Sequence, residues 1–171
     1  IDGETDNVFI GQEAGGGAIN GADYNVGIGS SALANAVTQD GSVAIGYLAL
    51  GALRTGIGNV AIGYRTLNNV DYSDYGNEYN TAVGYGAGQY ATGSYNTFFG
   101  GKAGQGGTTS APFTSGQNNT AIGYNSLAAV TTGVRNTAIG FHTLVANVSG
   151  INNTAVGRRA LYSNKSDENT A

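Results

Sequence analysis

Side chains that could carry out acid–base, nucleophilic or metal chemistry are scarce in this 171-residue chain. It contains one histidine, His142, and no cysteine. A nucleophile needs a base within hydrogen-bond reach, and a structural zinc site needs several Cys or His ligands. We therefore predict no catalytic residue, no metal site and no cofactor, and expect no enzyme. His142 follows a glycine by two residues, at a place that other repeats fill with unrelated residues such as Glu13 and Arg65, which favours a solvent-facing spacer.

Acidic residues gather in two places. Asp2, Glu4 and Asp6 alternate near the start, and a second group is mixed with tyrosines near residue 75. Carboxylates with nearby carbonyl oxygens can ligate Ca²⁺, but the glycine-rich nonapeptide of calcium-binding solenoids is absent, so a solvated loop is favoured. Long irregular loops often carry binding function. The candidates for receptor contact are Asp71, Tyr72, Asp74, Tyr75, Glu78 and Tyr79.

Aromatic residues recur directly after a series of regularly spaced glycines. If the repeats stack, these rings form a column along the stack. Flat amphipathic rings can stack on the C–H faces of sugars, or on one another as a structural ladder, and both interpretations stay open. The members of the column are Tyr47, Tyr64, Tyr85, Tyr124 and Phe141.

These residues must be positioned by an internal repeat, whose five-residue core ends in glycine. The cores are spaced by about 17 residues, which is typical of a stacked repeat protein. We predict surface loops at the two longer insertions, 68–79 and 104–118, and one repetitive domain over 1–171. Because a tenth core begins at Asn169, we expect a longer native polypeptide. The cores are NVFIG (7–11), NVGIG (25–29), SVAIG (42–46), NVAIG (59–63), NTAVG (80–84), NTFFG (96–100), NTAIG (119–123), NTAIG (136–140) and NTAVG (153–157).

Each core alternates in the manner of a β-strand. Its second and fourth residues share one face, and the third residue, mostly alanine, shares the other face with the glycine. A leucine four residues after most of the glycines predicts a second short strand, and the high glycine content opposes helix. The first-position Asn is expected either in an inward ladder along the stack or in a left-handed turn. The glycine marks positive φ or close backbone approach. The fold class is therefore all-β, a parallel β-solenoid or β-roll of about nine repeats.

The interior of such a coil is thin. One Ile or Val and one Leu per repeat must offset roughly 1.5 kcal/mol of ordering cost per residue. The alanine and glycine face stays small in almost every copy, as the close approach of a neighbouring backbone would require. We therefore predict that several copies of the chain associate side by side.

Charge and hydropathy exclude two classes of partner. Seven Lys and Arg against eleven Asp and Glu leave a net charge of −4 and no basic stripe, which argues against nucleic acid. No apolar run has the length of a membrane span, so no membrane partner is predicted. Without cysteine, the redox compartment cannot be inferred.

The cores resemble a known group of repeats. SVAIG at 42–46 and NTAIG at 119–123 and 136–140 resemble the heads of trimeric autotransporter adhesins, and NTAIGYNSL at 119–127 is similar to repeats of bacteriophage tail fibres and tailspikes. The resemblance covers essentially the whole chain, although adhesin heads commonly use shorter repeats. Adhesin heads are left-handed parallel β-rolls of three chains around an axis. The resemblance therefore implies an intertwined or packed homotrimer.

These observations predict a non-enzymatic fibre segment, the shaft or head of a phage tail fibre or surface adhesin. We expect it at the virion surface or outside the cell, with itself and a cell-surface glycan or protein receptor as partners. A purely structural extracellular filament would share these features.

The rival hypothesis is a monomeric solenoid that binds ice or another flat surface. It rests on threonine at the second core position of the last five copies. Valine in the first four copies, the two insertions in the spacing and the lack of paired Thr-x-Thr columns oppose it. The threonines are Thr81, Thr97, Thr120, Thr137 and Thr154.

Overall fold

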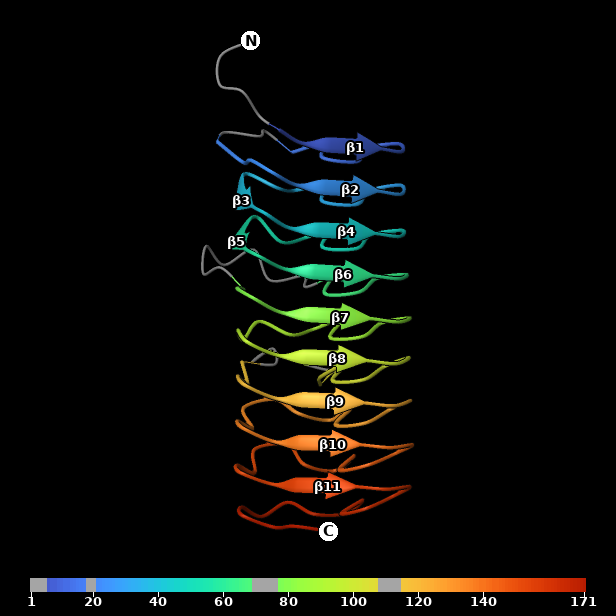
Figure 1. The fold of residues 1–171 in the computed structure, drawn as a ribbon, viewed down its shortest axis with the longest axis vertical. Coiled ribbons are helices and arrows are strands. Elements are labelled where there is room, and N and C mark those ends of the chain that lie inside the picture. The colour runs from blue at the N-terminus through green and yellow to red at the C-terminus, as the bar shows by residue number, and fades with distance from the viewer. Residues whose placement is uncertain (1–5, 18–20, 69–76, 108–114) are drawn as a thin grey trace.

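The computed structural model describes residues 6–17, 21–68, 77–107 and 115–171. The chain winds into one solenoid, with a strand of each coil stacked above the next and β1 and β11 at opposite ends of the long axis (Figure 1). The described residues contain no helix. The prediction of an all-β parallel solenoid is confirmed.

Nine short strands, one from each core, form a parallel sheet in the order β1-β2-β4-β6-β7-β8-β9-β10-β11. Two further strands in the return loops, β3 (Thr38–Asp40) and β5 (Thr55–Ile57), pair separately. The strands of the large sheet are β1 (Val8–Ile10), β2 (Val26–Ile28), β4 (Val43–Ile45), β6 (Val60–Ile62), β7 (Thr81–Val83), β8 (Thr97–Phe99), β9 (Thr120–Ile122), β10 (Thr137–Ile139) and β11 (Thr154–Val156).

The insertions do not disturb the register of the sheet. Val60 pairs with Thr81 across the first insertion, and Thr97 pairs with Thr120 across the second. Equivalent core positions are therefore neighbours on consecutive strands throughout. Parts of both predicted loops, 69–76 and 108–114, lie outside the described residues.

The inward face of the sheet is the alanine face, which corrects one prediction. Third-position residues such as Ala44 and Ala61 are fully buried inside the coil, whereas fourth-position residues such as Ile10 and Ile62 point outward. The small face is therefore not the contact with a neighbouring chain. On the opposite side of the same coil, a buried leucine lies so close to the strand that only the methyl group of an alanine fits between them.

The segment after each core glycine forms a second wall of turns, not the predicted second strand. Its second and fourth residues have positive φ, as in Arg65 (φ 52°) and Leu50 (φ 50°), a left-handed conformation incompatible with a β-strand. Its amides still bond between coils. The Arg65 N–H donates to the Tyr47 carbonyl of the preceding coil (2.8 Å), and the Leu50 N–H donates to the Thr66 carbonyl of the next coil (3.1 Å).

Bulk in the core is shared between the two walls. Six coils pair a small third-position residue with an inward leucine of the second wall. Glycine replaces the leucine in the first, fifth and sixth coils. Phenylalanine stands in the strand of the first and sixth coils. In the fifth coil Ala82 faces Gly88, and the Phe98 ring of the next coil fills the space, since a Cβ on Gly88 would lie 2.7 Å from it. A Cβ on Gly15 would lie 2.6 Å from the Phe9 ring, and one on Gly104 would overlap the ring of Phe98. Close packing is thus preserved by exchanging volume across the coil.

The first-position asparagines form the inward ladder, so the left-handed alternative was wrong. The Asn119 Nδ2 donates to the Gly133 carbonyl of its own return loop (2.8 Å), and its Oδ1 accepts the Asn136 N–H of the next coil (3.0 Å). Left-handed φ falls one residue earlier, at residues such as Asn118 and Arg135.

The core glycines meet both expectations. Gly63 has φ of 134°, and a Cβ there would lie 2.6 Å from the Gly84 carbonyl oxygen. A side chain at this position would therefore collide with the backbone of the next coil.

Candidate functional site

The candidate site is the turn edge, defined as the first and second residues after each core glycine. Five aromatic side chains occupy first positions, and their rings stack along the solenoid axis. Ring centroids lie 5.2 Å apart for Tyr47 and Tyr64, 5.1 Å for Tyr64 and Tyr85, and 5.9 Å for Tyr124 and Phe141. All five rings are exposed at the surface.

The ring column is divided into two blocks by Gly101, which holds the equivalent position in the coil of β8. Within a block the rings cover one another's faces. Tyr64 has a ring on each side and is nearly parallel to Tyr85, with an interplanar angle of 2°. Since sugars stack on ring faces, the inner rings act as a structural ladder, and only faces at block ends are free to meet a ligand. What the column binds stays a prediction.

Cations accompany the rings on the turn edge. The Arg65 guanidinium lies 5.5 Å from the Tyr64 ring centroid, and that of Arg158 lies 5.9 Å from Phe141. Lys102 follows Gly101 directly, and Glu13 is the one carboxylate residue at the first and second positions. From the coil of β6 onward this edge is therefore aromatic and positively charged.

His142 belongs to this aromatic surface and is not the solvent-facing spacer that the sequence predicted. Its side chain is half-buried, and its ring centroid lies 4.1 Å from that of Phe141 and 6.2 Å from that of Tyr162. Its Nδ1 is buried and has no hydrogen-bond partner. Stacking with neighbours on adjacent coils draws the imidazole against the surface.

The receptor-contact candidates fall partly outside the described residues. Asp71, Tyr72, Asp74 and Tyr75 lie there, whereas Glu78 and Tyr79 are described. The Glu78 backbone N–H donates to the Ser94 Oγ (3.2 Å). The structure thus fixes Glu78 at the end of the loop by a contact with the next coil.

Tyr79 forms a second ring pair that the sequence analysis did not identify. Its ring stacks on Tyr95 with centroids 5.6 Å apart, and both rings are half-exposed. The two residues precede the core asparagine in consecutive coils, and that shared position was the available signal. Stacking ties Tyr79 to the solenoid wall.

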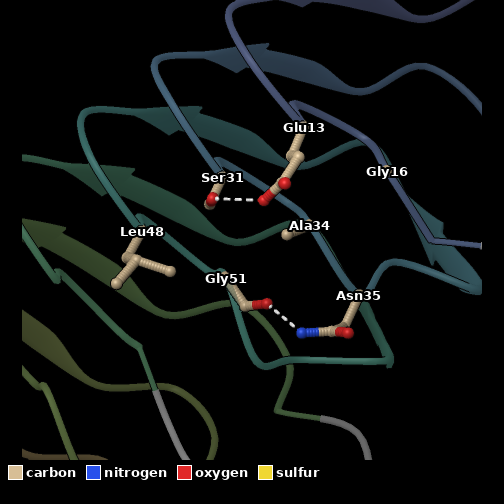
Figure 2. A pocket seen from close by; sticks show the side chains of 7 residues that line it. All are labelled: Glu13, Gly16, Ser31, Ala34, Asn35, Leu48 and Gly51. Carbon is tan, nitrogen blue, oxygen red and sulfur yellow. Dashed lines mark hydrogen bonds between the residues drawn. The ribbon is translucent and has the colours of Figure 1, made fainter.

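A surface pocket of about 330 Å³ lies at the other end of the turn edge, across the first three coils (Figure 2). The Ser31 Oγ donates to the Glu13 carboxylate (3.2 Å), and the Asn35 Nδ2 donates to the Gly51 carbonyl (2.6 Å). Glu13 is the one titratable residue of its lining, so the pocket lacks the paired groups of acid–base chemistry. Sequence reasoning missed it because its lining comes from three repeats.

The described parts of the chain contain no group of three or more His, Cys, Asp or Glu side chains arranged to hold a metal ion. Within the same ranges, no helix has the length and hydrophobicity needed to cross a membrane.

Comparison with known proteins adds no relative. The chain matches no protein-family model, no curated protein and no solved structure. The function is therefore inferred from the surfaces of the solenoid itself.

Proposed function

We propose that this chain is a non-enzymatic fibre segment, the shaft or head of a tail fibre or surface adhesin, which associates with two copies of itself and contacts a receptor. Its place is the virion surface or the outside of a cell. The observation that carries the proposal is an unbroken row of apolar fourth-position side chains on the outward side of the nine-stranded sheet, called here the outer sheet face. It consists of the second and fourth residues of each core.

Every fourth-position side chain on this face is apolar. Several are more than half exposed in the single chain, including Ile10 at 58% and Phe99 at 57%. Soluble monomers rarely expose contiguous apolar patches above a few hundred Å², and larger patches mark interaction surfaces. The nine residues are Ile10, Ile28, Ile45, Ile62, Val83, Phe99, Ile122, Ile139 and Val156.

A second copy of the chain is the natural complement of this face. At about 4.8 Å per strand, nine strands make a face roughly 40 Å long, and no second or fourth core position carries a charge. Burial would therefore desolvate no ionised group, a step that costs several kcal/mol per ion where it occurs. Three copies around an axis, as in the adhesin heads that the cores resemble, would bury the outer sheet faces together.

Attachment follows from the mechanics of the assembly. Backbone hydrogen bonds run from coil to coil in both walls, so bending the solenoid would strain many bonds at once. The fibre is thereby stiff, and the rings of the turn edge stay exposed along its length. A stiff rod with ligand-contacting edges suits adhesion at a distance.

Sedimentation equilibrium tests this proposal. We expect a mass near three times 17.2 kDa, and we expect the Ile62→Lys/Ile122→Lys variant to sediment as a monomer with an unchanged circular dichroism spectrum. The matched control is Val148→Lys, since Val148 is an exposed valine outside the outer sheet face. A monomeric natural chain at high concentration would contradict the proposal.

The same face supports a second candidate, a monomeric solenoid that binds ice or another flat surface. Five consecutive strands present threonine outward at the second position, and the insertions leave their pairing in register. The broken spacing that opposed this hypothesis therefore does not break the threonine column. Thermal hysteresis by a monomeric sample would favour this candidate, because a trimer would bury the threonines.

A further inference from the structure

We propose that the interruption of the ring column at Gly101 is a binding notch for one pyranose ring of a glycan, with a preference for acidic sugars. The notch is defined by Tyr85, Gly86, Gly101, Lys102 and Tyr124. The assignment rests on the proposed role in attachment and names the chemical class of the receptor.

The backbone does not explain the glycine at position 101. Gly101 has no positive φ, unlike the core glycine Gly100 beside it (φ 128°). The equivalent positions in the two coils on either side hold aromatic rings. A glycine at this position costs chain entropy on folding, and it leaves the column without a ring that could stack on its neighbours. What glycine supplies at this position is space.

Two aromatic rings bound that space along the solenoid axis. Tyr124 leans over Gly101, where a Cβ would lie 3.3 Å from the Tyr124 Cδ2. Tyr85 stacks on Tyr64, and its side chain is 58% exposed. Two strand spacings, about 10 Å, separate the backbones of Tyr85 and Tyr124. One ring between them would contact both tyrosines at about 3.5–4 Å.

Two side-chain amides lie beside Gly86, the residue that follows Tyr85. A Cβ on Gly86 would lie 3.3 Å from the Gln89 Oε1 and 3.6 Å from the Gln105 Nε2. The Gln105 Nε2 donates to the Gln89 Oε1 (3.0 Å). A side-chain amide has two donor hydrogens and two acceptor lone pairs, so this pair retains capacity for further hydrogen bonds near a ligand.

This combination fits a sugar better than an aromatic peptide side chain. A pyranose presents C–H faces to the tyrosines and hydroxyl groups to the amides, whereas a phenyl ring would leave the amides unmatched. Lys102 adds a positive charge at the mouth of the notch, which favours a sugar carboxylate.

Filling the notch with protein tests the proposal. In Gly101→Tyr, the new ring would complete the column with the spacing already seen for Tyr47 and Tyr64. Ser30→Tyr is the matched control, because Ser30 is the first residue after Gly29 and a ring there lengthens the column without entering the notch. Both positions lack positive φ. A Cβ at Gly101 requires only a small shift of the exposed Tyr124 ring, 3.3 Å away, so both variants should fold.

Binding is measured by saturation-transfer NMR and calorimetry against tetragalacturonate, maltotetraose, cellotetraose and tetra-N-acetylchitotetraose. We expect tetragalacturonate to bind most tightly, Gly101→Tyr to weaken binding about tenfold, near the upper worth of one aromatic contact, and Ser30→Tyr to bind like the natural chain. Lys102→Gln should weaken tetragalacturonate alone.

Three outcomes would overturn the notch: no binding of any of the four glycans, equal loss in the two tyrosine variants, or binding of a tyrosine-containing peptide in their place. Sedimentation of the same samples separates this result from the assembly proposal. A trimer that binds no glycan refutes the notch alone, and a monomer that binds through Gly101 refutes the trimer alone.

Discussion

At the scale of single residues, the asparagine ladder both closes each coil and joins it to the next. The Asn136 Nδ2 donates to the Gly150 carbonyl (2.7 Å), which fixes the return loop. Its Oδ1 accepts the Asn153 N–H of the next coil (3.0 Å). One buried side chain therefore satisfies two buried backbone groups that have opposite hydrogen-bonding character, because an amide carries both donors and an acceptor.

Asn136→Ala is predicted to destabilise the protein by about 3 kcal/mol, because it leaves a buried carbonyl and a buried N–H without partners at ~1–3 kcal/mol each. Urea unfolding at fixed protein concentration measures the effect. The control is Gln117→Ala, at an exposed side chain, which should shift stability by less than about 0.5 kcal/mol. Equal midpoints for the two variants would contradict the role assigned to the ladder.

At the scale of the element, a coil is a pair of walls that share one volume. Phe98 is buried beside Gly104, whereas six other coils place a small residue opposite a leucine. Gly104 has φ of 55°, close to the φ of 51° at Leu127, the leucine of the next coil. The two packing arrangements therefore have the same backbone conformation and differ only in which wall carries the large side chain.

This exchange predicts a double-mutant result. Phe98→Ala should cost about 3–5 kcal/mol through the cavity it leaves, and Gly104→Leu alone should cost about 1–3 kcal/mol through overpacking against Phe98. The double variant should be more stable than Phe98→Ala, because it rebuilds the alanine–leucine arrangement of other coils. Unfolding midpoints of the four proteins measure the coupling, and additive losses would rule out shared volume.

At the scale of the whole molecule, the solenoid is held together between neighbouring coils. Each strand of the large sheet contacts only the strands before and after it. Stability is then close to a sum of coil and interface contributions, provided that the register continues from end to end.

Removing residues 124–140 deletes one complete coil and joins Gly123 to Phe141, which keeps every side chain on its face. We expect a folded, shorter solenoid with the circular dichroism spectrum of the natural chain and a slightly lower melting temperature. Removing 125–140 deletes one residue fewer and leaves Tyr124 as an extra residue between a core glycine and the second wall. Leu144 then stands five residues after the glycine instead of four, so it loses its inward position, although the following strand can still pair in register. We expect this variant to melt well below the first deletion, because a buried leucine is lost at about 2–5 kcal/mol; similar melting curves for the two deletions would argue against coil-by-coil stacking.

The sequence by itself determined the period and the strand of each core, because these depend on local backbone preferences and on a spacing that recurs. It left the core asparagines between an inward ladder and a left-handed turn, and the structure decided for the ladder. The sequence also determined which rings share a column, since residues at equivalent positions must be neighbours in any stack. The pairing of Val60 with Thr81 shows that this holds even across an insertion.

Only the tertiary structure decided which face of the strand is inside. Alternation separates Ala61 from Ile62, and the larger residue is the usual choice for a core. In this solenoid the second wall lies so close that the methyl group of Ala61 fills the available space, and Ile62 is left outside. The distance between the walls depends on left-handed turns at residues such as Leu67 (φ 47°), a conformation that no local preference of leucine predicts. The pocket near Glu13 and the free face of Tyr85 likewise arise from the contact of separate coils.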